Sequence, residues 1–173
     1  MTSASADQPD LAELVGSLGL SSLLIDEYAL RSCGMDALAY GRRGNLIDAR
    51  TAIHISLERM RDGVSLTEEE RRIALALRDE EPRVLDELQE WGLTPDSATK
   101  AECFWQYCTF SALLRNWERR DFPEADFLEL LSGWDVPSTW QPPKGTTLGY
   151  GSRRRSRAWL EGMVAFERDA LCT

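Results

Sequence analysis

The sequence is poor in the residue types that most catalytic and metal sites use. It contains a single histidine, His54, which stands between Ile53 and Ile55 in an apolar stretch. A Ser-His-Asp or Cys-His site would have to be built around this one side chain, and the usual zinc and iron sites with several histidine ligands are excluded. We therefore interpret His54 as a residue of the core or of its edge. We expect no metal, no cofactor and no enzymatic activity.

Short motifs for phosphate, zinc and calcium binding are also absent, since the chain has no GxxxxGK[ST], GxGxxG, HExxH or EF-hand pattern. The adjacent acids Glu68, Glu69 and Glu70 would point in different directions on a helix, which makes them a poor cation site. Two carboxylates brought together only by the fold, as in glycoside hydrolysis, leave no signature in the sequence. An enzyme with such a dispersed carboxylate site is the less favoured alternative.

Long apolar runs and paired cysteines are missing as well. No run approaches the roughly 18 residues that a membrane-spanning helix needs, and residues 1–10 have neither the basic nor the apolar part of a secretory signal. Cys33, Cys103, Cys108 and Cys172 form no CxxC pair, which favours reduced packing thiols over a disulfide framework. These features predict a cytoplasmic protein without membrane association.

What is present is the composition of an ordinary acidic globular protein. The 173 residues are 43% hydrophobic and 28% charged, enough for one buried core. Lysine and arginine number 20 against 29 aspartate and glutamate, so the net charge of −9 argues against general affinity for nucleic acid or an anionic membrane. We expect a flexible tail over 1–10 and a single α-helical domain over 11–173.

Apolar residues recur at intervals of three and four along most of the chain, and no sustained alternation indicates a sheet. This pattern predicts an all-α fold of seven or eight helices. Thr67 and Glu70 have the spacing of a capping box ahead of an apolar face at Ile73, Leu75 and Leu77. Pro82 suits the first turn of the next helix. The segment 97–119 predicts the longest and most aromatic helix, at the centre of the core.

Glycine, serine and asparagine predict the earlier boundaries. After a short helix over 11–18, Ser21 or Ser22 would cap a second helix that Gly34 ends in the left-handed conformation. Gly41 and Gly44 would bracket a turn, and Asn45 would cap the helix that follows. Near the C-terminus we expect a helix over 121–133, a long loop rich in proline and glycine over 134–151, and a last helix capped by Ser152.

Acidic charge is concentrated between Glu58 and Glu90, a segment that contains eleven acidic residues and six arginines. One interpretation is a solvated surface laced by Glu–Arg pairs, and the other is a landing surface for a basic partner. Trp134 and Trp140, beside the proline-rich loop, could either fix that loop to the body or anchor a partner. The candidate partner contacts are Glu68, Glu69, Glu70, Asp79, Glu80, Glu81, Trp134 and Trp140.

The densest basic cluster is Arg153, Arg154, Arg155 and Arg157, on the first turns of the last helix. Positive charge there opposes the helix dipole, so an acidic partner is required for compensation. An intramolecular clamp onto the acidic helices is the favoured explanation, and binding of an anionic ligand is the alternative.

The C-terminal half resembles a bacterial domain-of-unknown-function family of small α-helical proteins found near toxin genes, which are suspected immunity proteins. The similarity lies in residues 121–143 and 149–169, notably 124–127, the Pro142-Pro143 pair, and Gly149-Tyr150 followed by Ser152. Residues 44–60 are a fainter match. The arginine cluster after Ser152 departs from the family, which has more acidic residues there.

The resemblance implies a non-catalytic protein that binds and neutralises a cognate toxin, and an acidic surface would suit a basic nuclease toxin. A stand-alone regulatory or scaffold protein-binding module is the alternative.

Overall fold

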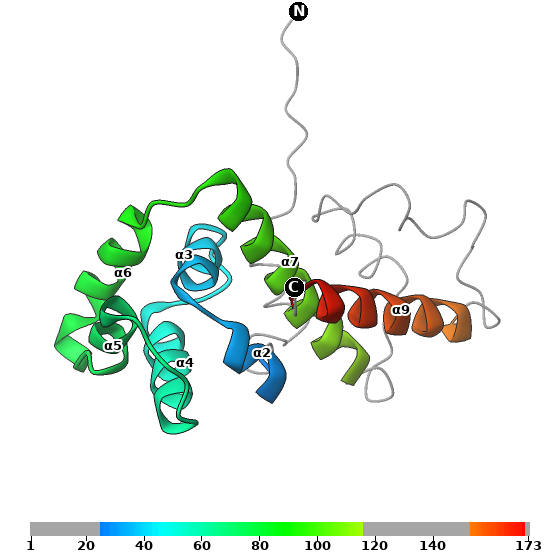
Figure 1. Cartoon of the computed structure of the whole chain (residues 1–173), viewed down its shortest axis with the longest axis horizontal. Helices are drawn as coiled ribbons and strands as arrows, with labels where there is room; N and C mark the ends of the chain where they lie inside the picture. Colours follow the sequence, from blue (N-terminus) through cyan, green and yellow to red (C-terminus); the bar gives the residue numbers. More distant parts are fainter. Residues whose placement is uncertain (1–24, 116–152, 172–173) are drawn as a thin grey trace, which may run out of the picture.

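The computed structural model describes residues 25–115 and 153–171 (Figure 1). Within these ranges the elements are helices and no strand occurs, which confirms the predicted all-α class. The elements are α2 (Glu27–Ser32), α3 (Met35–Arg43), α4 (Ala49–Arg61), α5 (Glu68–Ala74), the 3-10 turn η1 (Arg78–Glu80), α6 (Glu81–Glu90), α7 (Pro95–Arg115) and α9 (Arg153–Leu171). The predicted tail 1–10, the helices over 11–18 and 121–133, and the loop 134–151 lie outside the described residues.

Local capping fixes the starts of α5 and α7. The Thr67 hydroxyl oxygen accepts from the Glu70 amide at 3.3 Å, and the Glu70 carboxylate accepts from the Thr67 amide at 2.8 Å, so the capping box is confirmed. Helix α7 begins two residues earlier than predicted. Thr94 and Ser97 cap each other's amides at 3.2 and 3.0 Å, which leaves Pro95 in the first turn.

Three of the predicted boundaries in the first half are wrong. Gly34 has φ −84° and is not left-handed; it precedes α3, a helix that contains Gly41 in place of the expected turn. Asn45 does not cap α4 but takes φ 53°, because the amide of Leu46 bonds back to the Gly41 carbonyl at 2.7 Å and closes a turn. The cap is Asp48, whose carboxylate accepts from the Thr51 amide at 2.8 Å.

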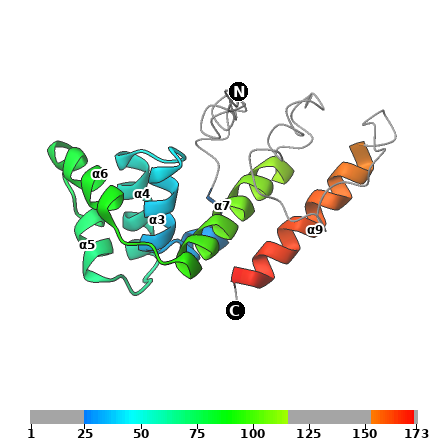
Figure 2. The same cartoon turned by 90° about the horizontal axis from the view of Figure 1, so that it is seen from above.

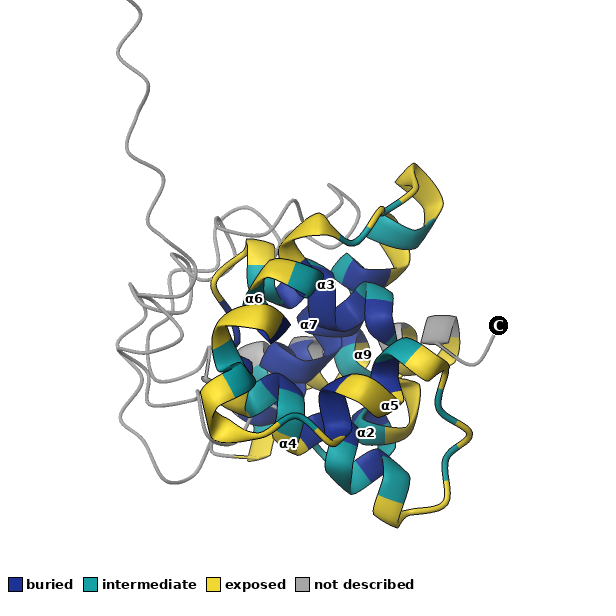
Figure 3. Ribbon diagram, turned by 90° about the vertical axis from the view of Figure 1, so that its left-hand side faces the viewer, coloured by how far each residue is buried: buried dark blue, intermediate teal, exposed yellow. Residues whose placement is uncertain are grey.

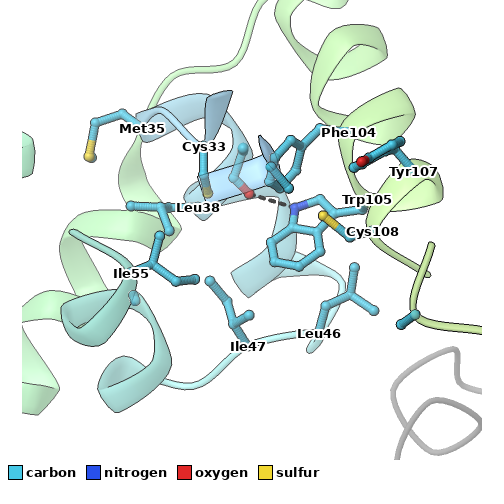
Figure 4. Close-up of a cluster of buried hydrophobic side chains, with 14 of the residues drawn as sticks. Cys33, Met35, Leu38, Leu46, Ile47, Ile55, Phe104, Trp105, Tyr107 and Cys108 are labelled. Atoms are coloured by element: carbon cyan, nitrogen blue, oxygen red, sulfur yellow. Dashed lines mark hydrogen bonds between the residues drawn. The ribbon is translucent and has the colours of Figure 1, made fainter. Parts of the chain in front are cut away.

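Helix α7 is the centre of the described core. It packs against α3 and α2 on one side and against α9 on the other (Figure 2). Helix α6 packs against α3, and α4 packs against α5, α6 and α2. The buried residues from Ala29 to Met163 form a single apolar cluster, so one core unites these helices. Trp105 is completely buried in it, and its indole nitrogen donates to the Ala37 carbonyl at 2.7 Å (Figure 4).

Helix α3 and helix α7 approach closely because Gly41 faces the Trp105 indole. A Cβ atom built on Gly41 would lie 2.5 Å from Trp105 Cζ2, well inside van der Waals contact. Only a residue without a side chain allows this approach. The glycine therefore serves helix packing here, with an ordinary helical backbone around it.

The cysteines of the described part are packing residues. Cys33, Cys103 and Cys108 are thiols and form no disulfide in the described part of the chain. Burial raises the pKa of the Cys33 thiol to about 12, and burial together with the neighbouring Cys33 raises the pKa of Cys108. Both groups stay protonated and unreactive at neutral pH. Cys172 lies outside the described residues.

Asp26 joins α2 to α7. Its carboxylate accepts from the Ala29 amide at 2.8 Å, from the Ser111 hydroxyl at 2.9 Å and from the Tyr107 hydroxyl at 3.0 Å. Partial burial alone would raise the Asp26 pKa, but these hydrogen bonds and the charge of Arg115 outweigh it and hold the pKa below the ordinary value of 3.8. The ionised form of Asp26 therefore stabilises the fold.

Replacement of Asp26 by Asn is expected to destabilise the protein most at neutral pH. Because the pKa of the native carboxyl is depressed, its contribution is complete above the unfolded-state pKa of about 4 and is lost as the pH falls through the native value. The free energy of unfolding, measured by urea titration, should differ between wild type and Asp26→Asn by less at pH 3 than at pH 7. A difference that does not change with pH would contradict this role for Asp26.

Candidate functional site

Most arginines of the acidic segment 58–90 are engaged with acids of the same surface. Five exposed or partly exposed ion pairs connect neighbouring turns and helices there. The pairs are Arg50–Glu81, Arg61–Glu58, Arg71–Glu68, Arg72–Glu87 and Arg83–Glu80. Exposed pairs of this kind contribute about 0–1 kcal/mol each. Among the candidate contacts, Glu68, Glu80 and Glu81 therefore take part in Glu–Arg pairs, and their contact with a partner stays a prediction.

Other acids of this segment have no ion-pair partner within the described part of the chain, namely Asp62, Glu69, Asp79, Asp86 and Glu90. Asp79, Asp86 and Glu90 are exposed: Asp86 and Glu90 lie one turn apart on the same side of α6, and Asp79 lies in η1 directly before this helix. We call these three residues the acidic stripe. The stripe carries the uncompensated negative charge that a landing surface needs.

Glu70 is not part of this surface, although the sequence suggested it as a contact. Its residue is 3% exposed, and its carboxylate pairs with the equally buried Arg59 at 3.2 Å. Arg59 also donates to the carbonyls of Leu30 and Arg31 at 3.3 and 3.1 Å. Glu70 therefore holds α5 and α4 to the end of α2 and cannot touch a partner.

The most exposed large apolar residues of the described part lie where α5 ends. Leu75 is 60% exposed and Leu77 is 67% exposed, and with Ala76 they form the segment that we call the leucine turn. The apolar pattern predicts both leucines on the helix face that begins at Ile73. Helix α5 stops at Ala74, so they turn outward. Leu75 stands two residues after Ile73, and Leu77 two after Leu75; this spacing of two was the available signal, because residues two apart do not share a helix face.

A shallow groove of about 470 Å³ lies beside the leucine turn. It is formed by α4, by Ala76 between α5 and η1, by Arg78 of η1 and by the start of α6. Figure 3 shows the ribbons of α4, α5 and α6 from the end of the molecule where these helices lie. Its lining residues are Arg50, Ile53, His54, Leu57, Ala76, Arg78 and Glu81. His54 is exposed here, so it belongs to the surface and not to the interior of the core.

The groove offers limited means for catalysis. Its one carboxylate, Glu81, is paired with Arg50 at 2.9 Å, so the groove is not the deep cleft with several carboxylates that a dispersed hydrolytic site requires. Among residues 25–115 and 153–171, no cluster of histidine, cysteine and acidic side chains could hold a metal ion.

The remaining candidates fall mostly beyond the described structure. Trp134 and Trp140 lie outside the described residues. Helix α9 begins at Arg153 as expected, but the side chains of Arg153, Arg154 and Arg155 are also outside the description. The Arg157 guanidinium pairs at 3.0 Å with Glu161, one turn along its own helix.

A comparison of the chain with family models, curated proteins and solved structures finds no match. The resemblance to the toxin-associated family therefore stays a prediction. Of the residues that carry it, 44–60 and 153–169 are described and 121–143 and 149–152 are not. None of the described helices is both long enough and apolar enough to span a bilayer.

Proposed function

We propose that this chain is a non-catalytic immunity protein that binds a cognate toxin domain and neutralises it. The observation that carries the proposal is the leucine turn, two exposed leucines beside the acidic stripe. Protein interfaces commonly have an apolar centre that supplies most of the binding energy and a charged rim that excludes water and guides approach. The toxin is the partner that the family resemblance implies.

Negative charge at this place favours a basic partner. The stripe residues have no ion-pair partner in the described structure, so their field extends into solvent. Such a field accelerates association with a positively charged surface and repels acidic proteins. A nuclease toxin has a basic substrate groove that the carboxylates could occupy in place of phosphates. A scaffold module would use the same surface, but its partner would not be toxic.

The proposal is tested with the protein encoded by the gene adjacent to this one. Co-expression should rescue cells from that product, and the purified proteins should form a complex. The double variant Leu75→Ser/Leu77→Ser should weaken the complex by at least thirtyfold, about the effect of losing one interface hot spot of ~2 kcal/mol. Asp79→Asn/Asp86→Asn/Glu90→Gln should mainly lower the association rate and its salt dependence, measured by surface plasmon resonance.

Phe166→Ser is the matched control, because Phe166 is also a half-exposed apolar residue but lies on α9, remote from α5 (Figure 1). It should leave rescue and affinity unchanged. Absence of a complex and of rescue would contradict the proposed function. A complex with a harmless neighbour would instead support the scaffold alternative.

A further inference from the structure

The groove has a charge pattern opposite to that of the surface around it. Arg50 and Arg78 line it with guanidinium groups, His54 offers an imidazole N–H donor, and Glu81 is its one carboxylate. Arg50 and Glu81 neutralise each other across their 2.9 Å pair. Arg78 has no ion-pair partner in the described part of the chain. An acidic protein therefore carries a locally cationic groove.

The rest of the lining is apolar. Ile53, Leu57 and Ala76 contribute aliphatic surface, and the exposed Leu75 and Leu77 flank Ala76 along the chain. A volume of about 470 Å³ is within the range of sites that accept a specific ligand. The groove can thus take an apolar side chain and an anionic group at the same time.

We propose, on the basis of the proposed function, that this groove receives a segment of the partner protein in which an aspartate or glutamate stands beside an aliphatic or aromatic residue. The carboxylate pairs with the Arg78 guanidinium, whose planar donors match it, and accepts a hydrogen bond from His54. The apolar neighbour packs on Ile53 and Leu57. The acidic stripe attracts the basic partner, and the groove selects the one that carries this segment.

The surroundings favour a protein segment over other anions. A nucleic acid or polyphosphate would bring many negative charges next to the acidic stripe and would be repelled. A single carboxylate brings only one negative charge, which its direct contact with the Arg78 guanidinium compensates. The aliphatic lining gives a free inorganic anion nothing to pack against.

The experiment is a selection of random 12-residue peptides displayed on phage against the full chain, followed by affinity measurement on the enriched peptides by fluorescence anisotropy. Enriched peptides should contain an acid next to an apolar residue. Arg78→Glu should weaken their binding at least tenfold, and His54→Ala should weaken it several-fold. Arg71→Glu is the matched control, because it makes the same charge change at an exposed arginine outside the groove. It should alter affinity less than twofold.

Several results would overturn the inference. These are no enrichment, enrichment of peptides without an acid, equal losses for Arg78→Glu and Arg71→Glu, or displacement of the peptides by millimolar inorganic phosphate, which would indicate a simple anion site. Circular dichroism of each variant excludes unfolding, and Arg78→Gln replaces Arg78→Glu if the latter does not fold. Since the selection does not use the toxin, failure here with intact rescue would leave the proposed function standing. Peptide binding without rescue would overturn only that function.

Discussion

Glu70→Ala is expected to destabilise the protein by about 3–5 kcal/mol, the usual effect of removing one partner from a buried ion pair. The Arg59 guanidinium would stay among core residues with its charge uncompensated, held only by the carbonyls of Leu30 and Arg31. The same variant loses the capping bond to the Thr67 amide, so α5 would also fray at its start. Urea unfolding at pH 7 measures the change.

Two further variants test whether the loss of stability in Glu70→Ala comes from leaving the buried Arg59 charge without a partner. Glu68 lies two residues before Glu70 and forms an exposed pair with Arg71. Glu68→Ala breaks this pair and should change the free energy of unfolding by less than about 1 kcal/mol. Arg59→Met/Glu70→Leu removes both charges and should recover much of the stability that Glu70→Ala loses. Equal effects of Glu70→Ala and Glu68→Ala would show that the ion pair is not buried in solution.

Gly41→Ala is expected to destabilise the protein by about 1–3 kcal/mol, the typical effect of adding a methyl group to a filled core. The added Cβ would lie 2.5 Å from Cζ2 of Trp105, and the indole cannot move away without breaking its hydrogen bond to the Ala37 carbonyl. The displacement would separate α3 from α7. Thermal unfolding and the near-ultraviolet circular dichroism of the tryptophan would report it.

Gly162→Ala is the control for the general effect of glycine in a helix. Gly162 lies on α9 with nothing within 4 Å of an added Cβ, so alanine there should stabilise the protein by about 0.5–1 kcal/mol. The two substitutions are chemically identical and are expected to have opposite signs. A stabilising Gly41→Ala would contradict the close contact between α3 and α7.

The stability variants also make the binding experiments interpretable. Glu70 was a candidate contact by sequence, so a loss of partner binding in Glu70→Ala would have looked like the loss of an interface residue. Because Glu70 is buried, a loss of partner binding in Glu70→Ala would result from unfolding and not from a missing contact. Leu75 and Leu77 are exposed, and their replacement should reduce binding with little change in stability.

Features that depend on a few neighbouring residues could be predicted from the sequence alone. The capping box at Thr67 and the apolar repeat of α7 follow from contacts three or four residues apart, which a pattern expresses directly. A local pattern does not decide between two residues that could both cap the same helix. Asn45 and Asp48 are both good caps, and the choice between them depends on the turn that the Gly41 carbonyl closes.

Which charged and apolar residues reach the surface depends on how the helices pack. Glu70 and Glu68 are both acids in the first turn of α5, but the approach of Arg59 from α4 buries Glu70 and leaves Glu68 in water. The groove likewise joins Ile53 of α4 to Arg78 of η1. Helix packing brings such residues together over long sequence separations, and neither their burial nor their encounter leaves a local signature.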